Sequence, residues 1–284
     1  MMPTIRRARA GFTLVELIVA LLLLVVVGGA LYKMLVVTQR TTRTQSERST
    51  MQGALRTGSQ LAIAELQELY TNAAVGEAFI TAMTPTQLDY RALRGYGLAC
   101  SVTNTEVRIR KAGWSGFQQP VLTRHRVLLF SDGDSAGIAT DDAWVDMPIN
   151  NVNASSTCPD GTAAWELGIA LPVPVAHIPI PGPVRTMEAM QLGLMTQGGR
   201  SWLGIRAVNV VGEQMTPLAG PLRANGLQFR YFANTATTVT PAQVTAIELW
   251  LFGETERGAQ RGIGGATQLL QDSVRIRVNL RNSD

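Results

Sequence analysis

An apolar segment near the amino terminus limits what this 284-residue chain can fold into. Residues 12–37 are almost all apolar, and the part from Leu17 to Tyr32 contains no charged side chain. A helix needs about 20 predominantly apolar residues to cross a bilayer whose hydrocarbon core is about 30 Å thick. The segment is therefore long enough to span a membrane as one helix. Glu16 is the exception near its start, and because a carboxylate in a bilayer is costly without a cationic partner, we expect that partner to come from elsewhere.

The residues around Glu16 form a motif. The order Gly11-Phe12-Thr13-Leu14-Val15-Glu16 follows a short basic leader. It resembles the class III signal of type IV prepilins and type II secretion pseudopilins. The resemblance implies that a prepilin peptidase cleaves between Gly11 and Phe12, that residues 1–11 are lost and that the new Phe12 amine is methylated. It also implies that Glu16 meets the charged Phe12 amine of a neighbouring subunit during assembly, an attraction that is stronger in low-dielectric surroundings than in water.

Two other interpretations of the amino terminus remain open. An ordinary secretory signal peptide would use residues 17–27 as its apolar region and would be cleaved at the small residues 28–30. A single-pass anchor would keep the segment uncleaved. Basic residues lie on both sides of the apolar segment, so the positive-inside rule does not fix the orientation. A cytoplasmic amino terminus is implied by the resemblance alone.

Helical periodicity continues beyond the segment that could span a membrane. Residues 38–60 are mostly polar and contain no proline, and apolar or small residues recur every three or four positions. The recurring residues are Met51, Leu55, Gly58, Ala62, Leu66 and Leu69. This spacing predicts one face of an amphipathic helix. We therefore expect a membrane or assembly helix at 12–37, its amphipathic continuation at 38–70 and a globular head at 71–284.

The head has the pattern of an antiparallel sheet, because short alternating segments are separated by glycine-containing turns. The predicted strands are 87–92, 106–110, 127–130, 165–171, 187–195, 202–208, 226–232, 246–252 and 273–280, with turns at 94–97 and 196–199. Five prolines predict an extended stretch at 171–183, which we interpret as a connection between two halves of the head. The expected fold class is α+β: a long amino-terminal helix, half membrane and half amphipathic, packed on an antiparallel β-sheet head.

Cys100 and Cys158 are the two cysteines of the chain. An even number of cysteines in a domain that is expected outside the cytoplasm favours a disulfide. In the chain-entropy model such a bridge would stabilise the fold by about 4 kcal/mol. The alternative is two thiols too far apart to bridge.

The sequence predicts no catalytic or metal site. The acidic segment 131–135, with residues 141–142 beyond it, offers oxygen ligands but lacks the order of a calcium-binding loop. We interpret it as a solvated turn and leave calcium binding open. His125 and His177 lack the spacing of metal ligands, and the glycine-rich segment 262–266 lacks the lysine of a phosphate-binding loop. We therefore expect no enzymatic activity and no cofactor.

Two parts of the head sequence indicate a more specific function. Segment 88–100 and the closing strands resemble the heads of PilW-like minor pilins, and the J-type pseudopilin of type II secretion has a similar long head. The resemblance implies a structural subunit that initiates assembly or sits at the tip of a pilus. A J-type pseudopilin, or a tip module that binds a surface or DNA, remains an alternative.

The expected partners are other pilin or pseudopilin subunits, the prepilin peptidase and the inner membrane. The formal charge of +4 falls to +1 when the leader arginines Arg6, Arg7 and Arg9 are removed. Nucleic acid is therefore not an expected partner, although the pairs 108/110 and 275/277 place arginines on one strand face. The location expected from the resemblance is the inner membrane, crossed once with the head outside the cytoplasm, and then a cell-surface pilus or a periplasmic pseudopilus.

Overall fold

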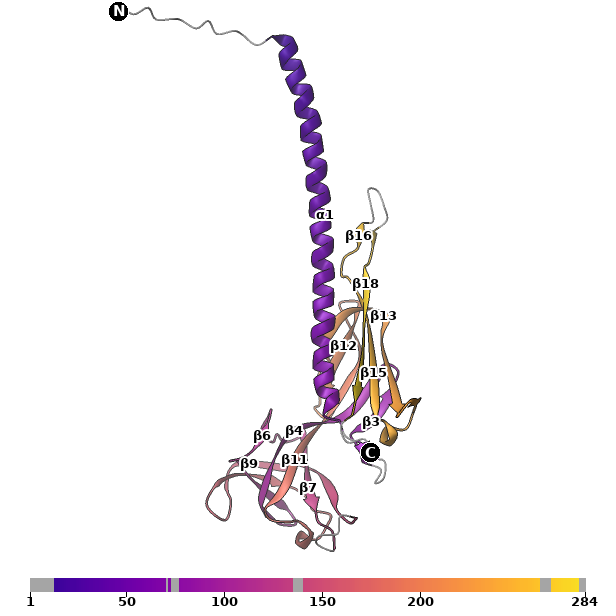
Figure 1. Cartoon of the computed structure of the whole chain (residues 1–284). Helices are drawn as coiled ribbons and strands as arrows, with labels where there is room; N and C mark the ends of the chain where they lie inside the picture. The colour runs from indigo at the N-terminus through magenta and orange to yellow at the C-terminus, as the bar shows by residue number, and fades with distance from the viewer. Residues whose placement is uncertain (1–12, 70, 73–76, 135–139, 261–266, 281–284) are drawn as a thin grey trace, which may run out of the picture. The chain divides into compact units, whose positions relative to one another are not determined.

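The computed structural model describes residues 13–69, 71–72, 77–134, 140–260 and 267–280. These residues form one long helix and sheets in which every strand pair is antiparallel (Figure 1). The expected α+β class is therefore confirmed. Contacts divide the chain into two compact units, residues 1–50 with 255–270 and residues 51–254 with 271–284.

The first unit contains most of helix α1, which runs from Leu14 to Gln67. Nearly all of its apolar side chains between Leu14 and Val37 are exposed, for example Val25 at 71%. Among the described residues, α1 is the helix with the length and hydropathy needed to cross a membrane. Strands β16 (Ala259–Gln260) and β17 (Thr267–Gln268) pair in the same unit. The exposed apolar surface is consistent with a membrane anchor, as in pilins.

The second unit begins with the amphipathic end of α1. The buried residues of this part are Met51, Leu55, Gly58, Ser59, Ala62 and Leu66. They include five of the six predicted positions, and the sixth, Leu69, is also fully buried although the helix ends two residues earlier. A Cβ atom at Gly58 would lie 2.2 Å from the Cβ of Ala219, so glycine allows the helix backbone to approach the sheet closely.

The strands of the main sheet are β3 (Ile80–Thr84), β4 (Gln87–Val102), β5 (Glu106–Arg110), β6 (Ser115–Gly116), β7 (His125–Ser131), β8 (Ala143–Pro148), β9 (Asn151–Thr157), β10 (Ala163–Gly168), β11 (Gly182–Gln197), β12 (Arg200–Ala207), β13 (Thr216–Ala233), β14 (Ala236–Thr237), β15 (Ala246–Glu254) and β18 (Gln271–Asn279). Their main order is β18-β15-β13-β12-β11-β4-β5-β10-β9. Strands β3 and β6 pair with β4, β7 pairs with β11 and β8, and β14 pairs with β13. Strands β1 (Thr71–Asn72) and β2 (Glu77–Ala78) form a separate pair.

Two hydrophobic clusters stabilise the head. The first joins α1 to the parts of the sheet around β12, β13 and β15, beside which the end of α1 lies in Figure 1. The second lies among β5, β7, β8 and β10. The long strands β4 and β11 contribute to both, since Tyr90 and Leu192 belong to the first cluster and Ala99 and Val184 to the second. These two strands therefore carry the sheet from one cluster into the other.

The turn predicted at 94–97 is wrong, because these residues lie inside β4, and Gly95, Tyr96 and Gly97 pair with β11. A Cβ atom at Gly95 would lie 2.2 Å from the Trp114 side chain, and one at Gly97 would lie 2.8 Å from it. The glycines therefore make room for an indole ring rather than for a reversal of the chain. By contrast, Gly198 and Gly199 form the predicted hairpin turn between β11 and β12, with φ angles of 60° and 73°.

The proline-rich stretch is not extended throughout, because residues Val175–His177 form a 3₁₀ turn. A second 3₁₀ turn, Pro241–Gln243, precedes β15. The division of the head at 171–183 stays a prediction. The predicted strand at 165–171 is shifted to Ala163–Gly168, and β3, β8 and β9 were not predicted. Strand β9 is mostly exposed and polar, so it lacks the apolar alternation by which a strand is recognised.

Candidate functional site

The amino-terminal motif lies at the start of α1. The Thr13 hydroxyl accepts a hydrogen bond from the backbone N–H of Glu16 at 3.3 Å, and the Thr13 carbonyl accepts one from Leu17 at 3.2 Å. Thr13 therefore caps the helix. The spacing Thr-x-x-Glu is also the sequence signature of a capping box, a signal that sequence reasoning missed. Gly11 and Phe12 lie outside the described residues.

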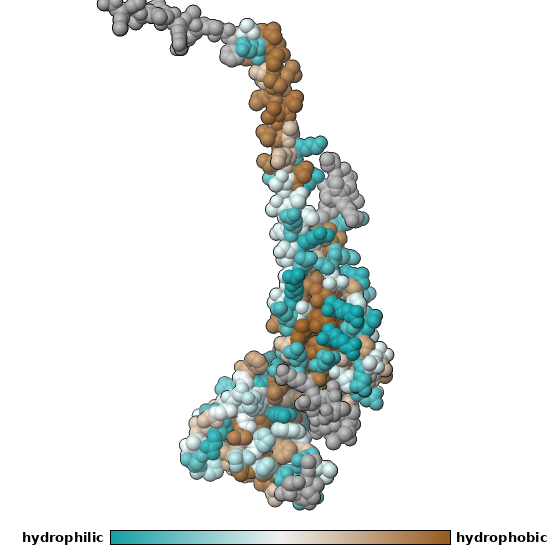
Figure 2. Space-filling model, in the orientation of Figure 1, coloured by the Kyte–Doolittle hydropathy of each residue, from teal (hydrophilic) through white to brown (hydrophobic). Residues whose placement is uncertain are grey.

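Glu16 occupies the first turn of α1 with its side chain exposed. A carboxylate is favourable there because the amino-terminal end of a helix carries partial positive charge. Within the part of the chain that the structure describes, Glu16 forms no ion pair, and its neighbours Leu14, Val15 and Leu17 are exposed apolar residues. Figure 2 shows hydrophobic residues gathered along this part of the helix. The carboxylate thus lies at the edge of a large apolar surface.

The head contains the expected disulfide between Cys100 and Cys158, whose Cα atoms are 5.7 Å apart. Cys100 belongs to β4, and Cys158 follows β9 in the turn that leads to β10. That turn is closed by hydrogen bonds from Cys158 to Thr162 and from Gly161 to Cys158. The bridge therefore ties the β9–β10 hairpin to the end of β4.

A network of charged groups around the buried Glu188 links α1 to the sheet. Glu188 on β11 is 2% exposed and accepts a hydrogen bond from Arg94 Nε at 2.6 Å. Its other carboxylate oxygen pairs with Arg124. Arg94 also contacts Glu65 of α1 at 3.3 Å, and Arg124 contacts Glu213 at 3.2 Å. Sequence reasoning missed this network because its members are far apart in the chain.

His125 packs beside this network and is 3% exposed. Its Nδ1 accepts a hydrogen bond from the Val121 N–H at 3.1 Å, and its Nε2 has no hydrogen-bond partner among the described residues. A proton added at Nδ1 would displace the Val121 bond. Burial, reinforced by the positive charges of Arg124 and Arg94 and opposed by Glu188, lowers the pKa of His125 below its usual value.

We expect the free energy of unfolding to fall as the pH is lowered from about 6.5, by at most about 1.4 kcal/mol per pH unit. Below the unfolded-state pKa of His125 the unfolded chain binds a proton, whereas the folded chain binds it only at lower pH because its pKa is depressed. Denaturation of the full-length protein between pH 5 and 7 measures this loss. His125→Asn should flatten the profile. Equal profiles for His125→Asn and the wild type would contradict the assignment.

The acidic loop connects to the proline-rich stretch. The Asp132 N–H donates to the His177 carbonyl at 2.8 Å, and His177 Nε2 lies 3.1 Å from Asp134 Oδ1. Asp141 packs against Gly133 across the loop. Over the residues that the structure describes, no three His, Cys, Asp or Glu side chains group as a metal site requires. The acidic loop therefore contacts His177 of the proline-rich stretch, and calcium binding by the loop stays an open alternative.

The arginine pairs singled out in the sequence make contacts within the head. Arg108 pairs with Glu106 and Glu166, and Arg110 pairs with Asp160. Arg275 pairs with the buried Glu248 and lies over Trp250, and Arg277 lies over Phe232. Carboxylates or aromatic rings of the chain therefore already occupy part of each guanidinium group, which weakens the case for a phosphate-binding face.

The comparisons with known proteins concern the amino terminus. A family described as the prokaryotic N-terminal methylation motif matches residues 6–32. The match covers the segment Gly11–Glu16 and the first part of the apolar helix. No curated protein and no solved structure is significantly similar to the chain. A prepilin-type methylation motif, set before an exposed apolar helix and a β-sheet head, supports a type IV pilin-like family for this chain.

Proposed function

We propose that this chain is a minor type IV pilin, a structural subunit that initiates assembly of a pilus or sits at its tip. One observation carries the proposal: the processing motif lies directly before a helix whose exposed apolar part continues without a break into a part packed on the head. Such a helix can leave a membrane and enter a bundle of like helices, because both surroundings bury the same apolar side chains. The head of roughly 200 residues, larger than that of most major pilins, supports a minor role.

In this proposal a prepilin peptidase cuts between Gly11 and Phe12 and the new Phe12 amine is methylated. The exposed apolar side chains from Leu14 to Val37 then pack against the helices of other pilin subunits. Glu16 meets the Phe12 amine of a neighbour and so fixes the relative position of two helices. Before assembly the subunit crosses the inner membrane once, with its head outside the cytoplasm.

The amino-terminal mass of the protein recovered from its own cells tests the processing step. We expect the mature chain to begin at an N-methylated Phe12, since the residues from Gly11 to Glu16 match the motif throughout. Gly11→Val places a branched side chain at the cleavage point and should leave the precursor intact. A wild-type chain that begins at Leu31 would identify a secretory signal peptide, and an uncut chain would identify a plain anchor.

Deletion of the gene distinguishes a pilus from a secretion system. We expect fewer surface pili in the deletion strain, with secretion of folded proteins unchanged, and restoration by the full-length chain. Normal pili with lost secretion would assign the chain instead to the J-type pseudopilins.

A binding role for the head is the second candidate, favoured by a surface groove. The groove has a volume of about 970 Å³ and is lined by Tyr96, Trp144 and Arg185, among others. Tyr96 is 54% exposed and Leu98 beside it is 49% exposed, which is typical of contact surfaces. Weakened adhesion by Tyr96→Ala cells that carry normal numbers of pili would support this role, and unchanged adhesion would oppose it.

A further inference from the structure

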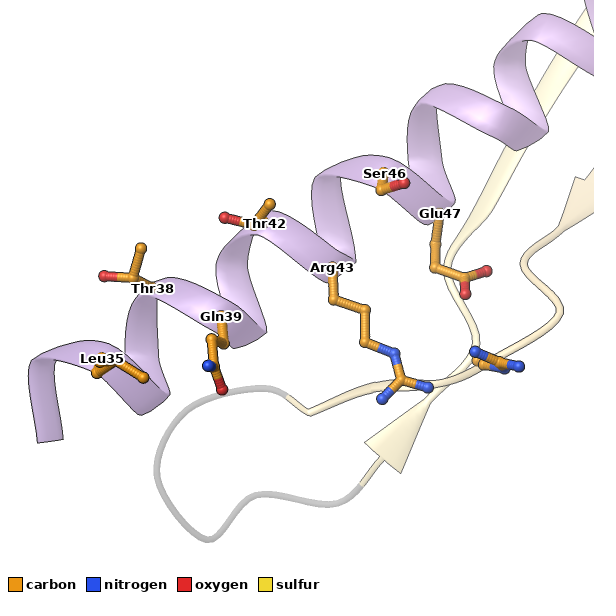
Figure 3. Close-up of a pocket in the computed structure, with 8 residues that line it drawn as sticks. Leu35, Thr38, Gln39, Thr42, Arg43, Ser46 and Glu47 are labelled. Atoms are coloured by element: carbon orange, nitrogen blue, oxygen red, sulfur yellow. The ribbon is translucent and has the colours of Figure 1, made fainter. Parts of the chain in front are cut away.

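Three arginines surround two adjoining pockets just beyond the apolar part of α1. Arg43 and Arg257 line both pockets, whose volumes are about 510 Å³ and 230 Å³, and Arg40 lines the smaller one. Arg40 and Arg43 belong to α1, whereas Arg257 precedes β16, so the cluster joins two segments of the first unit. In Figure 3, Gln39, Arg43 and Glu47 project from the same side of the helix. The fold therefore concentrates positive charge at one place.

Within the described part of the chain, the positive charges of this cluster exceed the negative charge around it. Among the described residues, Arg40, Arg43 and Arg257 form no ion pair, and all three are exposed. Glu47 is the acidic side chain that lines both pockets, which leaves an excess of two positive charges. The arginines of the head at 94, 108, 110 and 124, by contrast, all pair with carboxylates. The cluster thus has unused capacity to bind an anion.

The position of the cluster along α1 indicates where that anion would be. A hydrocarbon core that takes in about 20–24 residues from Leu14 ends between Lys33 and Val37. At 1.5 Å per residue, Arg40 then lies about 5–11 Å beyond the core. The headgroup layer on each side of a bilayer is about 5–8 Å thick, and arginine side chains on a helix lean toward its amino terminus, here toward the membrane. The guanidinium group of Arg40 therefore lies at the level of lipid phosphates, and that of Arg43, which starts about 4.5 Å further along the helix axis, leans back toward this level.

We propose that this cluster binds the phosphate of an anionic phospholipid headgroup while the subunit is in the membrane. Guanidinium groups bind phosphate oxygens through paired, charge-assisted hydrogen bonds. The Gln39 amide and the Thr42 hydroxyl line the larger pocket and add neutral hydrogen-bonding groups, and Leu35 gives it an apolar wall at its membrane end. The inference rests on the proposed function in one respect, that α1 spans a membrane.

Lipid retention by the purified full-length chain tests the inference. The protein is extracted into mixed micelles with equal amounts of phosphatidylglycerol and phosphatidylcholine, and retained lipid is counted by native mass spectrometry. We expect one phosphatidylglycerol per chain in preference to phosphatidylcholine. In R43Q/R257Q the affinity should fall about 25-fold, because each basic side chain near an anionic headgroup contributes about fivefold.

K33Q/R48Q is the matched control. It removes the same amount of positive charge, and Lys33 lies inside the apolar segment 12–37, nearer the membrane than Arg43. Neither Lys33 nor Arg48 lines the two pockets. K33Q/R48Q should retain the lipid as the wild type does. If both double variants lost lipid affinity equally, the binding would be general attraction by a charged surface, and the proposed site would be overturned. Equal retention of both lipids by the wild type would also overturn it.

Inorganic phosphate distinguishes a lipid headgroup from a free anion. At millimolar concentrations it should leave the bound lipid in place, because the lipid is also held by its acyl chains; displacement would identify a free-phosphate site and overturn the lipid assignment. The result is independent of processing at Phe12. If cells never process the chain but the purified chain retains the lipid, the pilin proposal is overturned and the lipid site stands. If the chain is processed and assembled but shows no lipid selectivity, the lipid site alone is overturned.

Discussion

Replacing Glu188 by alanine should lower the free energy of unfolding by about 3–5 kcal/mol, because it removes one partner from a buried ion pair. Glu188 is 2% exposed and contacts both Arg94 and Arg124. The substitution leaves the two guanidinium groups with Glu65 and Glu213 alone, at 3.3 Å and 3.2 Å. It also loosens the link between α1 and β11. Denaturant unfolding of the full-length protein in detergent, followed by tryptophan fluorescence of the head, gives the change in free energy.

Glu106→Ala is the control for this prediction. Glu106 pairs with Arg108 at 3.1 Å, but its side chain is 31% exposed. Exposed ion pairs contribute about 0.2–1 kcal/mol, so Glu106→Ala should lower stability by less than about 1 kcal/mol. If both substitutions lowered stability equally, burial of the Glu188 side chain would not be the source of its contribution, and the account of Glu188 would be wrong.

Glu16→Ala should leave cleavage after Gly11 intact and reduce recovery of the subunit in assembled filaments at least about tenfold. A hydrogen bond to a charged group contributes about 1.5–3 kcal/mol, and about 1.4 kcal/mol corresponds to a factor of ten. The carboxylate is exposed and forms no ion pair among the described residues, so it is available to the amine of a neighbouring subunit. Immunoblots of sheared filaments against total membrane protein measure the ratio.

Two further substitutions separate charge pairing from helix capping. Glu16→Gln keeps the size of the side chain and removes its charge, so it should impair incorporation as much as Glu16→Ala. Thr13→Ala removes the hydroxyl that accepts from the Glu16 N–H at 3.3 Å, at a cost of about 1 kcal/mol to the helix start. It should impair incorporation far less. If Thr13→Ala reduced incorporation into filaments as much as Glu16→Ala, loss of helix capping would explain both effects, and pairing of Glu16 with an amine would not be needed to explain them.

Local patterns in the sequence predicted the helix and much of the sheet. The buried face of α1 at Met51, Leu55, Ala62 and Leu66 follows from a spacing of three and four residues, because helical geometry places such residues on one side. The alternation of β18 follows in the same way from the period of a strand. The motif at 11–16 is contiguous, so its resemblance to a processing signal is visible without any structure.

Contacts between distant segments were decided only in the tertiary structure. Glycines at 95 and 97 predicted a turn, but the Trp114 ring placed against them shows that they serve packing inside a strand. Glu188 meets Arg94 and Arg124 because antiparallel pairing brings β11 against β4 and β7, and register over such separations cannot be read from neighbouring residues.

The arginine cluster likewise combines Arg257 with two residues more than two hundred positions earlier. The sequence by itself determined the processing motif, the apolar helix and its amphipathic continuation, since each depends on residues within a few turns of one another. The buried charge network and the basic pockets depend on which side chains the folded backbone brings within hydrogen-bonding reach, and only the tertiary structure fixes those distances.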